Sequence, residues 1–228
     1  FIPTLRKPEL YYDTIKPRAT HRFLSIPRKP VGELPGALAE YIKWGKRSRT
    51  AQPAMRALGG KWYSHVHKQL NVKKPFGGVF LPDKIDPSFR NRGVFACYSQ
   101  TPLAPSKNFH IVSLDDSIKE KALVGWFNST LFIAYFTLAN RRISKNWARL
   151  LVADYLRMPI VNVNSLSRRT LSELEKSVDD LSEEKLPPVK LQLGLDYRLS
   201  IDRTLLDAIG VSEPESLLKR LYSTLDLS

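Results

Sequence analysis

The spacing of apolar residues changes along the chain, and each change predicts a different kind of structure. Residues 1–35 contain six prolines, which exclude a long helix and leave room only for short extended pieces such as residues 21–26. Apolar residues at helical spacing then predict a helix that begins near Pro35 and ends at Gly45. This helix is the first long element that we expect.

Between residues 61 and 112 the pattern becomes typical of β-strands. Short aromatic or β-branched runs alternate with Gly, Pro, Asn and Asp, the residues that favour turns. Four runs fit strands: residues 61–65, 78–81, 93–98 and 108–112. Several strands so close together predict a sheet that is largely antiparallel.

A long apolar stretch at residues 122–139 approaches the length of a membrane span, but polar residues 128–130 interrupt its middle. Asn and Ser at that point suit the start of a second helix, so the stretch predicts two buried helices. Ser117 and Glu120 form a capping box that opens the first of them. A polar, basic loop follows at residues 140–146.

The next segment predicts a short helix, which ends before Met158-Pro159, and then a closing strand at residues 160–163. The helix would turn four apolar residues inward: Trp147, Leu150, Leu151 and Leu156.

Three further helices are predicted after residue 165. An amphipathic stripe from Leu171 to Leu181 marks the first, and residues 197–209 form the second, with Gly210 as its stop. Ser212 and Glu215 form a capping box at the start of the third helix. The whole pattern therefore predicts an α+β fold, with a mixed, largely antiparallel sheet and packed helices in residues 1–164 and a helical C-terminal segment in residues 165–228.

Charge is distributed unevenly between the two halves of the chain. Residues 1–110 hold 20 Lys and Arg against six Asp and Glu, whereas residues 111–228 hold 16 of each kind. Like charge gathered in one region opposes compaction, but it is what binding to a polyanion requires, because each neutralised phosphate releases a counterion. The first half is therefore where we expect nucleic acid to bind.

The remaining composition is that of a globular protein, with 43% hydrophobic residues. A single cysteine, Cys97, excludes an internal disulfide and fits a reducing cytosol, so we expect a cytoplasmic protein and a core role for this thiol. Because the chain starts at Phe1 without an apolar leader, we expect it to be part of a longer protein.

Catalytic motifs are missing from the sequence. The pairs Gly59-Gly60 and Gly77-Gly78 favour turns over a phosphate-binding loop, and no nucleophile–base set stands out by spacing. His65 and His67 would share a face if residues 61–67 were a strand, but they lack a third metal ligand nearby. The acidic pairs leave a metal-dependent nuclease as an alternative.

Basic residues of the first half stand beside flat side chains such as Trp44, Trp62 and Phe89. Lys and Arg hold phosphates, while Arg and Asn also read base edges. The loop at residues 140–146 adds further cations, which would otherwise complement a helix end. Twelve residues make up the expected DNA-binding face: Lys46, Arg47, Arg49, Arg56, Lys61, Lys73, Lys74, Arg90, Arg92, Arg141, Arg142 and Lys145.

The order of several motifs carries a family resemblance. The motifs are Trp62-Tyr63, Asn108-Phe109-His110-Ile111, Trp126-Phe127-Asn128-Ser129 and Leu156-Arg157-Met158-Pro159-Ile160, followed by Arg198-Leu199-Ser200-Ile201-Asp202 and Leu221-Tyr222 in the tail. This order resembles the target recognition domain at the C-terminal end of adenine-specific N6 DNA methyltransferases of restriction-modification systems. The group includes fused methylase-restriction enzymes and the related specificity subunits, and the resemblance covers about residues 34–225.

The resemblance implies sequence-specific binding of double-stranded DNA, with a catalytic methyltransferase domain or subunit as partner. That family carries a Gly-rich S-adenosylmethionine loop and an Asn/Asp-Pro-Pro-Tyr/Phe motif in a preceding domain. This chain has neither, since Pro187-Pro188 stands between Leu186 and Val189. We therefore expect no cofactor in this chain and S-adenosylmethionine in the catalytic domain. An RNA-binding or assembly module remains an alternative.

Overall fold

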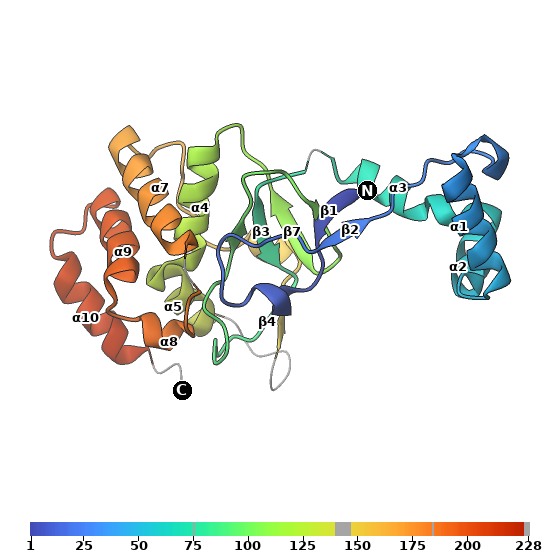
Figure 1. The fold of residues 1–228 in the computed structure, drawn as a ribbon. Coiled ribbons are helices and arrows are strands. Elements are labelled where there is room, and N and C mark those ends of the chain that lie inside the picture. The colour runs from blue at the N-terminus through green and yellow to red at the C-terminus, as the bar shows by residue number, and fades with distance from the viewer. Residues whose placement is uncertain (75, 140–146, 184, 226–228) are drawn as a thin grey trace. The chain divides into compact units, whose positions relative to one another are not determined.

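The computed structural model describes residues 1–74, 76–139, 147–183 and 185–225 and has an α+β fold (Figure 1). Its contacts divide the chain into two compact units. The smaller unit comprises Phe1–Thr4 and Ala19–Pro75, and the larger comprises Leu5–Arg18 and Phe76–Ser228. The predicted boundary near residue 165 does not coincide with this division, because the C-terminal helices pack in the larger unit.

The smaller unit is mainly helical. Its elements are β1 (Ile2–Leu5, whose last residue belongs to the larger unit), β2 (His21–Phe23), the 3-10 helix η2 (Val31–Glu33), α1 (Gly36–Arg47), α2 (Gln52–Leu58), the 3-10 helix η3 (Gly59–Ser64) and α3 (His65–Val72). β1 and β2 pair antiparallel. A small apolar core of Ile26, Leu34, Ile42 and Tyr63 holds the helices together. The expected helix at residues 35–45 is confirmed by α1.

The strand predicted at residues 61–65 is wrong, because this segment is helical. Tyr63 enters the core beside Ile42, and its hydroxyl donates a hydrogen bond to the carbonyl of Lys29 over 2.6 Å. Tertiary packing of the aromatic rings thus overrides their preference for strands. The strand geometry that would bring His65 and His67 to one face does not arise.

The larger unit is built on a short antiparallel sheet in which β3 lies between β5 and β7. Its extended elements are β3 (Val79–Pro82), β4 (Lys84–Ile85), β5 (Cys97–Tyr98), β6 (Ala104–Pro105), β7 (Phe109–Val112) and β8 (Ala148–Arg149), and the 3-10 helix η1 spans Pro8–Tyr11. β4 and β8 form a separate antiparallel pair. The strands expected at residues 78–81 and 108–112 are confirmed by β3 and β7.

Helices cover one side of this sheet in successive layers (Figure 1). The helices of the unit are α4 (Ser117–Asn128), α5 (Thr130–Ala139), α6 (Val152–Tyr155), α7 (Arg168–Ser182), α8 (Val189–Gln192), α9 (Asp196–Ala208) and α10 (Pro214–Thr224). α4 contacts β3 and β5, α7 packs against α4, α9 against α7, and α10 against α9. The three predicted C-terminal helices are confirmed and continue the layering that α4 begins.

Two predicted elements after the sheet are wrong. The expected helix at residues 147–156 is the strand β8 followed by the single turn α6, because the backbone N–H of Leu150 bonds to the carbonyl of Asp83 and extends the β4–β8 pairing. Leu150 is buried as expected, whereas Trp147, Leu151 and Leu156 are exposed. The expected strand at residues 160–163 does not form in the described structure.

Helix starts differ from the predicted capping boxes by a residue. Asp116, not Ser117, caps α4, with its carboxylate accepting a hydrogen bond from the Ile118 N–H over 2.9 Å. Glu120 is buried and accepts a hydrogen bond from the Leu114 N–H. Glu213 precedes α10 and makes no side-chain cap. α4 and α10 are where the sequence predicts them, and only their first residues shift.

The apolar stretch at residues 122–139 forms two helices, as the polar interruption predicts. α4 and α5 are bent by 53° at Ser129, and no single helix in the described part of the chain has the length and apolar composition of a membrane span, whereas this bent pair together does. Ser129 caps α5, since its hydroxyl accepts a hydrogen bond from the Phe132 N–H. Both helices bury large aromatic side chains around Phe95.

Asn128, the last residue of α4, is fully engaged inside the core. Its side-chain oxygen accepts hydrogen bonds from the N–H groups of Phe95 (2.7 Å) and Ala96 (3.3 Å). Its amide group donates to the carbonyls of Ala96 and Val124, both over 2.9 Å. Because residues 95–96 bond to this side chain, the strand predicted at residues 93–98 shortens to the two residues of β5.

The motif around Asn128 meets the Arg198–Asp202 motif in the same buried region. Asp202 accepts hydrogen bonds from the Thr130 N–H over 2.7 Å and from the Tyr222 hydroxyl over 2.9 Å. Arg198 donates to the Asn128 carbonyl and to the side chain of Gln192. Burial raises the pKa of Asp202 and lowers the pKa of Arg198, and each charge opposes the shift of the other.

Replacing Asn128 by Ala tests this junction. The variant leaves the buried N–H groups of Phe95 and Ala96 without their acceptor, so we expect the free energy of unfolding to fall by about 2–3 kcal/mol. Urea unfolding, monitored by circular dichroism, measures this free energy. The exposed Asn91 supplies the control, and Asn91→Ala should change stability by less than about 0.5 kcal/mol. Equal losses in both variants would contradict the structural role of Asn128.

Cys97 provides a second test of the core. The thiol is 1% exposed, and burial raises its pKa to about 12. We therefore expect it to react with a thiol reagent at pH 8 at least about 100-fold more slowly in the native chain than in urea. Absorbance of the released thiolate from an aromatic disulfide reagent follows both rates. Rapid reaction of the folded protein would contradict this packing.

Candidate nucleic-acid interface

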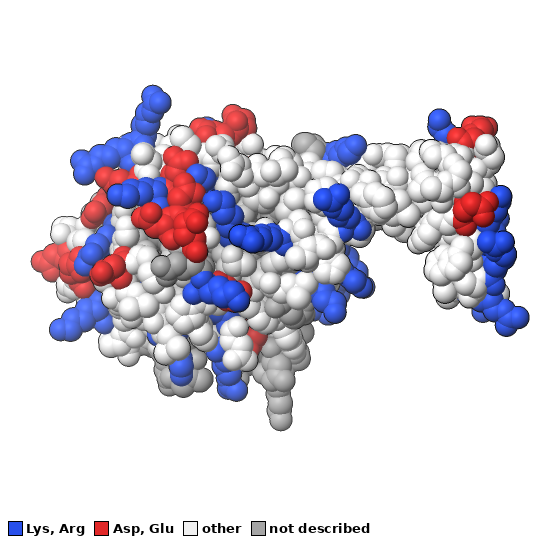
Figure 2. All heavy atoms as spheres, viewed as in Figure 1, with Lys and Arg blue, Asp and Glu red and all other residues white. Residues whose placement is uncertain are grey.

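The excess positive charge of the protein is concentrated in the smaller unit. This unit is about a quarter of the chain, yet it holds 12 Lys and Arg against two Asp and Glu, a net charge of +10 out of the total of +14. The larger unit carries the remaining +4. Figure 2 shows Lys and Arg side chains along one edge of the α1–α2 end, with acidic groups beside them. The asymmetry between halves of the sequence is thus an asymmetry between folded units.

Seven of the twelve predicted DNA-binding residues belong to this unit. They are Lys46 and Arg47 in the last turn of α1, Arg49 just beyond it, Arg56 on α2, Lys61 in η3, and Lys73 and Lys74 after α3. All are exposed except Lys73, which is half-buried. None of the ion pairs between described residues involves any of the seven. Their charges are available to an external anion.

Arg49 is held in an uncommon backbone conformation. It follows the C-cap Ser48 of α1 with φ of 62°, in the left-handed region that a helix end normally gives to Gly. A side chain with a Cβ costs about 1 kcal/mol there. Arg49 therefore reduces stability at this position, and its side chain continues the row of cations that Lys46 and Arg47 begin in the last turn of α1.

An aromatic pair lies beside these cations on α1. The rings of Tyr41 and Trp44 stack with centroids 5.8 Å apart, and both side chains are about half exposed, at 46% and 51%. On the same helix, a hydrogen bond from Lys43, at 2.8 Å, lowers the pKa of Glu40. Exposed flat rings next to Lys and Arg are a combination that proteins use to stack and hold unpaired bases of nucleic acids.

A pocket of about 610 Å³ lies between η3 and α3 in the same unit. Its lining contains three cations, two histidines, two polar residues and two apolar ones: Arg28, Lys61, Lys68, His65, His67, Ser64, Asn71, Leu58 and Val72. No acidic residue lines it. Of this set, only Lys61 belongs to the predicted DNA-binding face, and His65 and His67 stand out in the sequence only as candidate metal ligands, because the pocket joins residues that are 40 positions apart.

Arg92 does not belong to the predicted surface. It is 3% exposed, and its guanidinium donates hydrogen bonds to the carbonyls of Val94 and Phe95. The same group lies over the Tyr12 ring, 4.9 Å from its centroid. Arg92 therefore stabilises the core of the larger unit, and the expectation that it faces DNA is wrong.

The other four predicted positions are not brought into the smaller unit. Arg90 is exposed and belongs to the larger unit. Arg141, Arg142 and Lys145 fall within residues 140–146, which lie outside the described residues.

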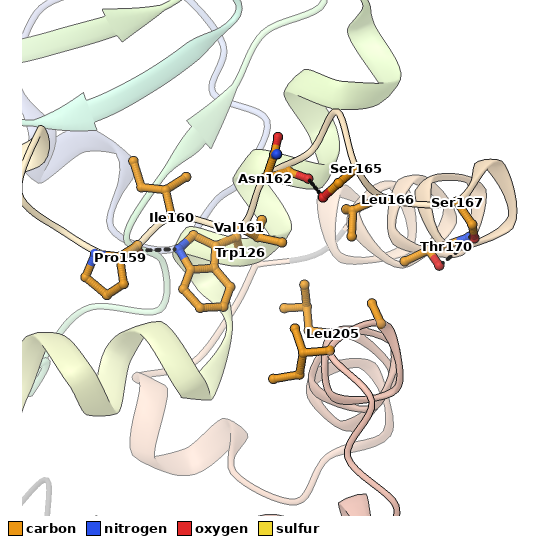
Figure 3. Close-up of a pocket in the computed structure, with 12 residues that line it drawn as sticks. Trp126, Pro159, Ile160, Val161, Asn162, Ser165, Leu166, Ser167, Thr170 and Leu205 are labelled. Carbon is orange, nitrogen blue, oxygen red and sulfur yellow. Dashed lines mark hydrogen bonds between the residues drawn. The ribbon is translucent and has the colours of Figure 1, made fainter.

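The larger unit has a pocket of a different chemistry, also of about 610 Å³ (Figure 3). Trp126 of α4, Leu205 of α9 and the segment from Pro159 to Thr170 contribute to its lining, and no charged residue does. The Trp126 indole N–H donates to the Pro159 carbonyl over 3.1 Å. Two motifs of the family resemblance thus meet at this pocket, which suits an apolar or neutral polar group.

Gly77 and Gly93 lie where the described chain leaves no room for a side chain. A Cβ at Gly77 would collide with the backbone of Val112, and one at Gly93 would collide with the carbonyls of Leu186 and Pro187. The Pro187 carbonyl accepts a hydrogen bond from the Gln192 side chain. Among the described residues, no three His, Cys, Asp or Glu side chains gather as metal ligands.

Comparison with protein-family models, with curated proteins and with solved structures finds no match to this chain.

Proposed function

We propose that this chain binds duplex DNA through its smaller unit, as the target recognition part of an adenine-specific N6 DNA methyltransferase of a restriction-modification system. The observation that carries the proposal is the net charge of +10 on the smaller unit. So high a density opposes folding of a unit with a small core, so a polyanionic partner best accounts for it.

Two features favour duplex DNA among polyanions. The basic residues extend from the end of α1 to the end of α3, which suits a partner with regularly spaced phosphates. Arg47, Arg49 and Arg56 add guanidinium groups, which can pair with guanine edges as well as with phosphate. In this proposal Lys side chains set the register, and arginines from helix ends read bases.

The larger unit acts as the scaffold in this proposal. Its charge is nearly balanced, and the motifs that resemble the methyltransferase family lie mostly there. The S-adenosylmethionine site and the catalytic motif belong to a separate domain or subunit, which works in the cytoplasm with this chain. Choosing the site at which that domain extrudes and methylates an adenine is the role left to this chain.

Salt dependence of DNA binding tests the basic footprint. Replacing Lys46, Arg47 and Arg49 together by Ala should lower the affinity for a duplex and flatten the slope of log K against log salt by about 0.9 for each lost phosphate contact. Fluorescence anisotropy of a labelled duplex at several salt concentrations measures both quantities.

Lys185, Lys190 and Lys219 in the larger unit provide the matched control, because their removal deletes the same charge. If both triple variants weaken binding alike, the smaller unit is not the footprint. Tighter binding of a double-stranded RNA of the same sequence would favour an RNA-binding module, and metal-dependent cleavage by the chain would favour a nuclease.

Arg49 separates binding from stability. Arg49→Gly relieves the left-handed backbone and removes one cation, so we expect the free energy of unfolding to rise by about 1 kcal/mol while the salt slope falls by about 0.9. Arg49→Ala removes the same charge and keeps the strained backbone, so it should weaken binding equally without the gain in stability. Unchanged DNA affinity in both variants would remove Arg49 from the interface.

A further inference from the structure

The basic pocket of the smaller unit is built from three separate segments. Arg28 comes from the segment before η2, Lys61 and Ser64 from η3, and Lys68 and Asn71 from α3. Arg28, Lys61 and Lys68 are exposed, and none takes part in an ion pair within the described structure. Three cations therefore converge on one hollow without an internal counter-charge.

Polar groups of this pocket are fixed by a hydrogen-bonded chain. Asn71 donates its amide N–H to His67 Nε2 over 3.0 Å, and His67 Nδ1 lies 2.8 Å from the Ser25 hydroxyl. With Nε2 acting as acceptor, the imidazole carries its proton on Nδ1 and donates it to Ser25. Asn71 has a second amide N–H, which can add a neutral donor to the charged groups of the pocket.

We propose that this pocket binds the phosphate monoester group of a phosphorylated ligand. A concave site with several donors surrounds its ligand, which suits a terminal group with three free oxygens and a charge near −2. A phosphodiester inside a duplex has two free oxygens and a sugar on each side, so it fits a convex or flat surface better. Leu58 and Val72 on the wall offer apolar contact to the organic part of the ligand.

The ligand can come from two sources, a 5′-phosphorylated end of a nucleic acid or a small phosphorylated metabolite. Both offer the same monoester to Arg28, Lys61 and Lys68. Phosphate binding at this site can be tested separately from duplex binding, because Arg28 and Lys68 lie outside the predicted DNA-binding set and only Lys61 belongs to both.

Titration of the full chain with inorganic phosphate tests the site. Amide signals of residues in the pocket, such as Ser64 and Asn71, should shift in a saturable way in nuclear magnetic resonance spectra, and chloride at matched ionic strength should not produce the shift. Arg28→Gln combined with Lys68→Gln should weaken phosphate binding by roughly tenfold or more. Shifts that fail to saturate, or that spread over all exposed cations, would overturn the proposal.

Arg22→Gln combined with Lys43→Gln is the matched control, since both residues are exposed cations of the same unit outside the pocket and outside the predicted DNA-binding set. This variant should bind phosphate like the wild type, and an equal loss in both double variants would overturn the proposal by reducing it to net charge.

Short duplexes and deoxyadenosine monophosphate identify the source. If a 5′-phosphorylated duplex binds at least tenfold more tightly than its 5′-hydroxyl form, and the mononucleotide competes weakly, the ligand is a nucleic-acid end. If the mononucleotide binds as tightly as the phosphorylated duplex, the ligand is a small molecule. Failure of the 5′-hydroxyl duplex to bind at all would contradict the proposed function and leave the phosphate site standing.

Discussion

Burial of polar groups where α4 gives way to α5 is the constraint on which the larger unit depends. A chain that changes direction inside a core exposes backbone groups that water cannot reach, and each costs free energy unless another group bonds it. Asn128, Ser129 and Asp202 supply those bonds from side chains. Because Asn128 also binds residues 95–96, and Asp202 binds Tyr222 of α10, the same junction ties the sheet to the last helix.

The smaller unit differs from the larger one, because it combines a small apolar core with a high surface charge. Its core is a few apolar side chains around Ile42 and Tyr63, and its surface carries a net charge of +10. Self-repulsion among these cations reduces the stability of the free protein, and the polyanion of the proposed function would remove that cost on binding. The left-handed backbone at Arg49 also reduces stability, since Gly would be more stable at this position than a residue with a side chain. In the proposed function, the cations that would bind the polyanion are therefore also the ones that reduce the stability of this unit.

The two pockets differ in chemistry in the same way as the two units. One is lined by cations and histidines without an acid, and the other by apolar and neutral polar residues without any charge. An anionic ligand is attracted by the charges of the first pocket only. An apolar group can fill the second pocket without removing water from any charged side chain. The chemistry that suits the proposed anionic ligand is thus confined to the smaller unit.

Local patterns in the sequence determined five of the longer helices, α1, α4, α5, α7 and α9. The amphipathic stripe of α7 and the polar break at residues 128–130 were readable, because helix periodicity and capping depend on neighbours within a few residues. The charge asymmetry could also be predicted, because it follows from counting the charged residues along the sequence. Tertiary structure alone decided that residues 61–65 are helical, that Arg92 is buried, and that Arg28 joins Lys61 and Lys68 in one pocket. Each of these depends on contacts between distant segments, whose packing and hydrogen bonds outweigh local preference.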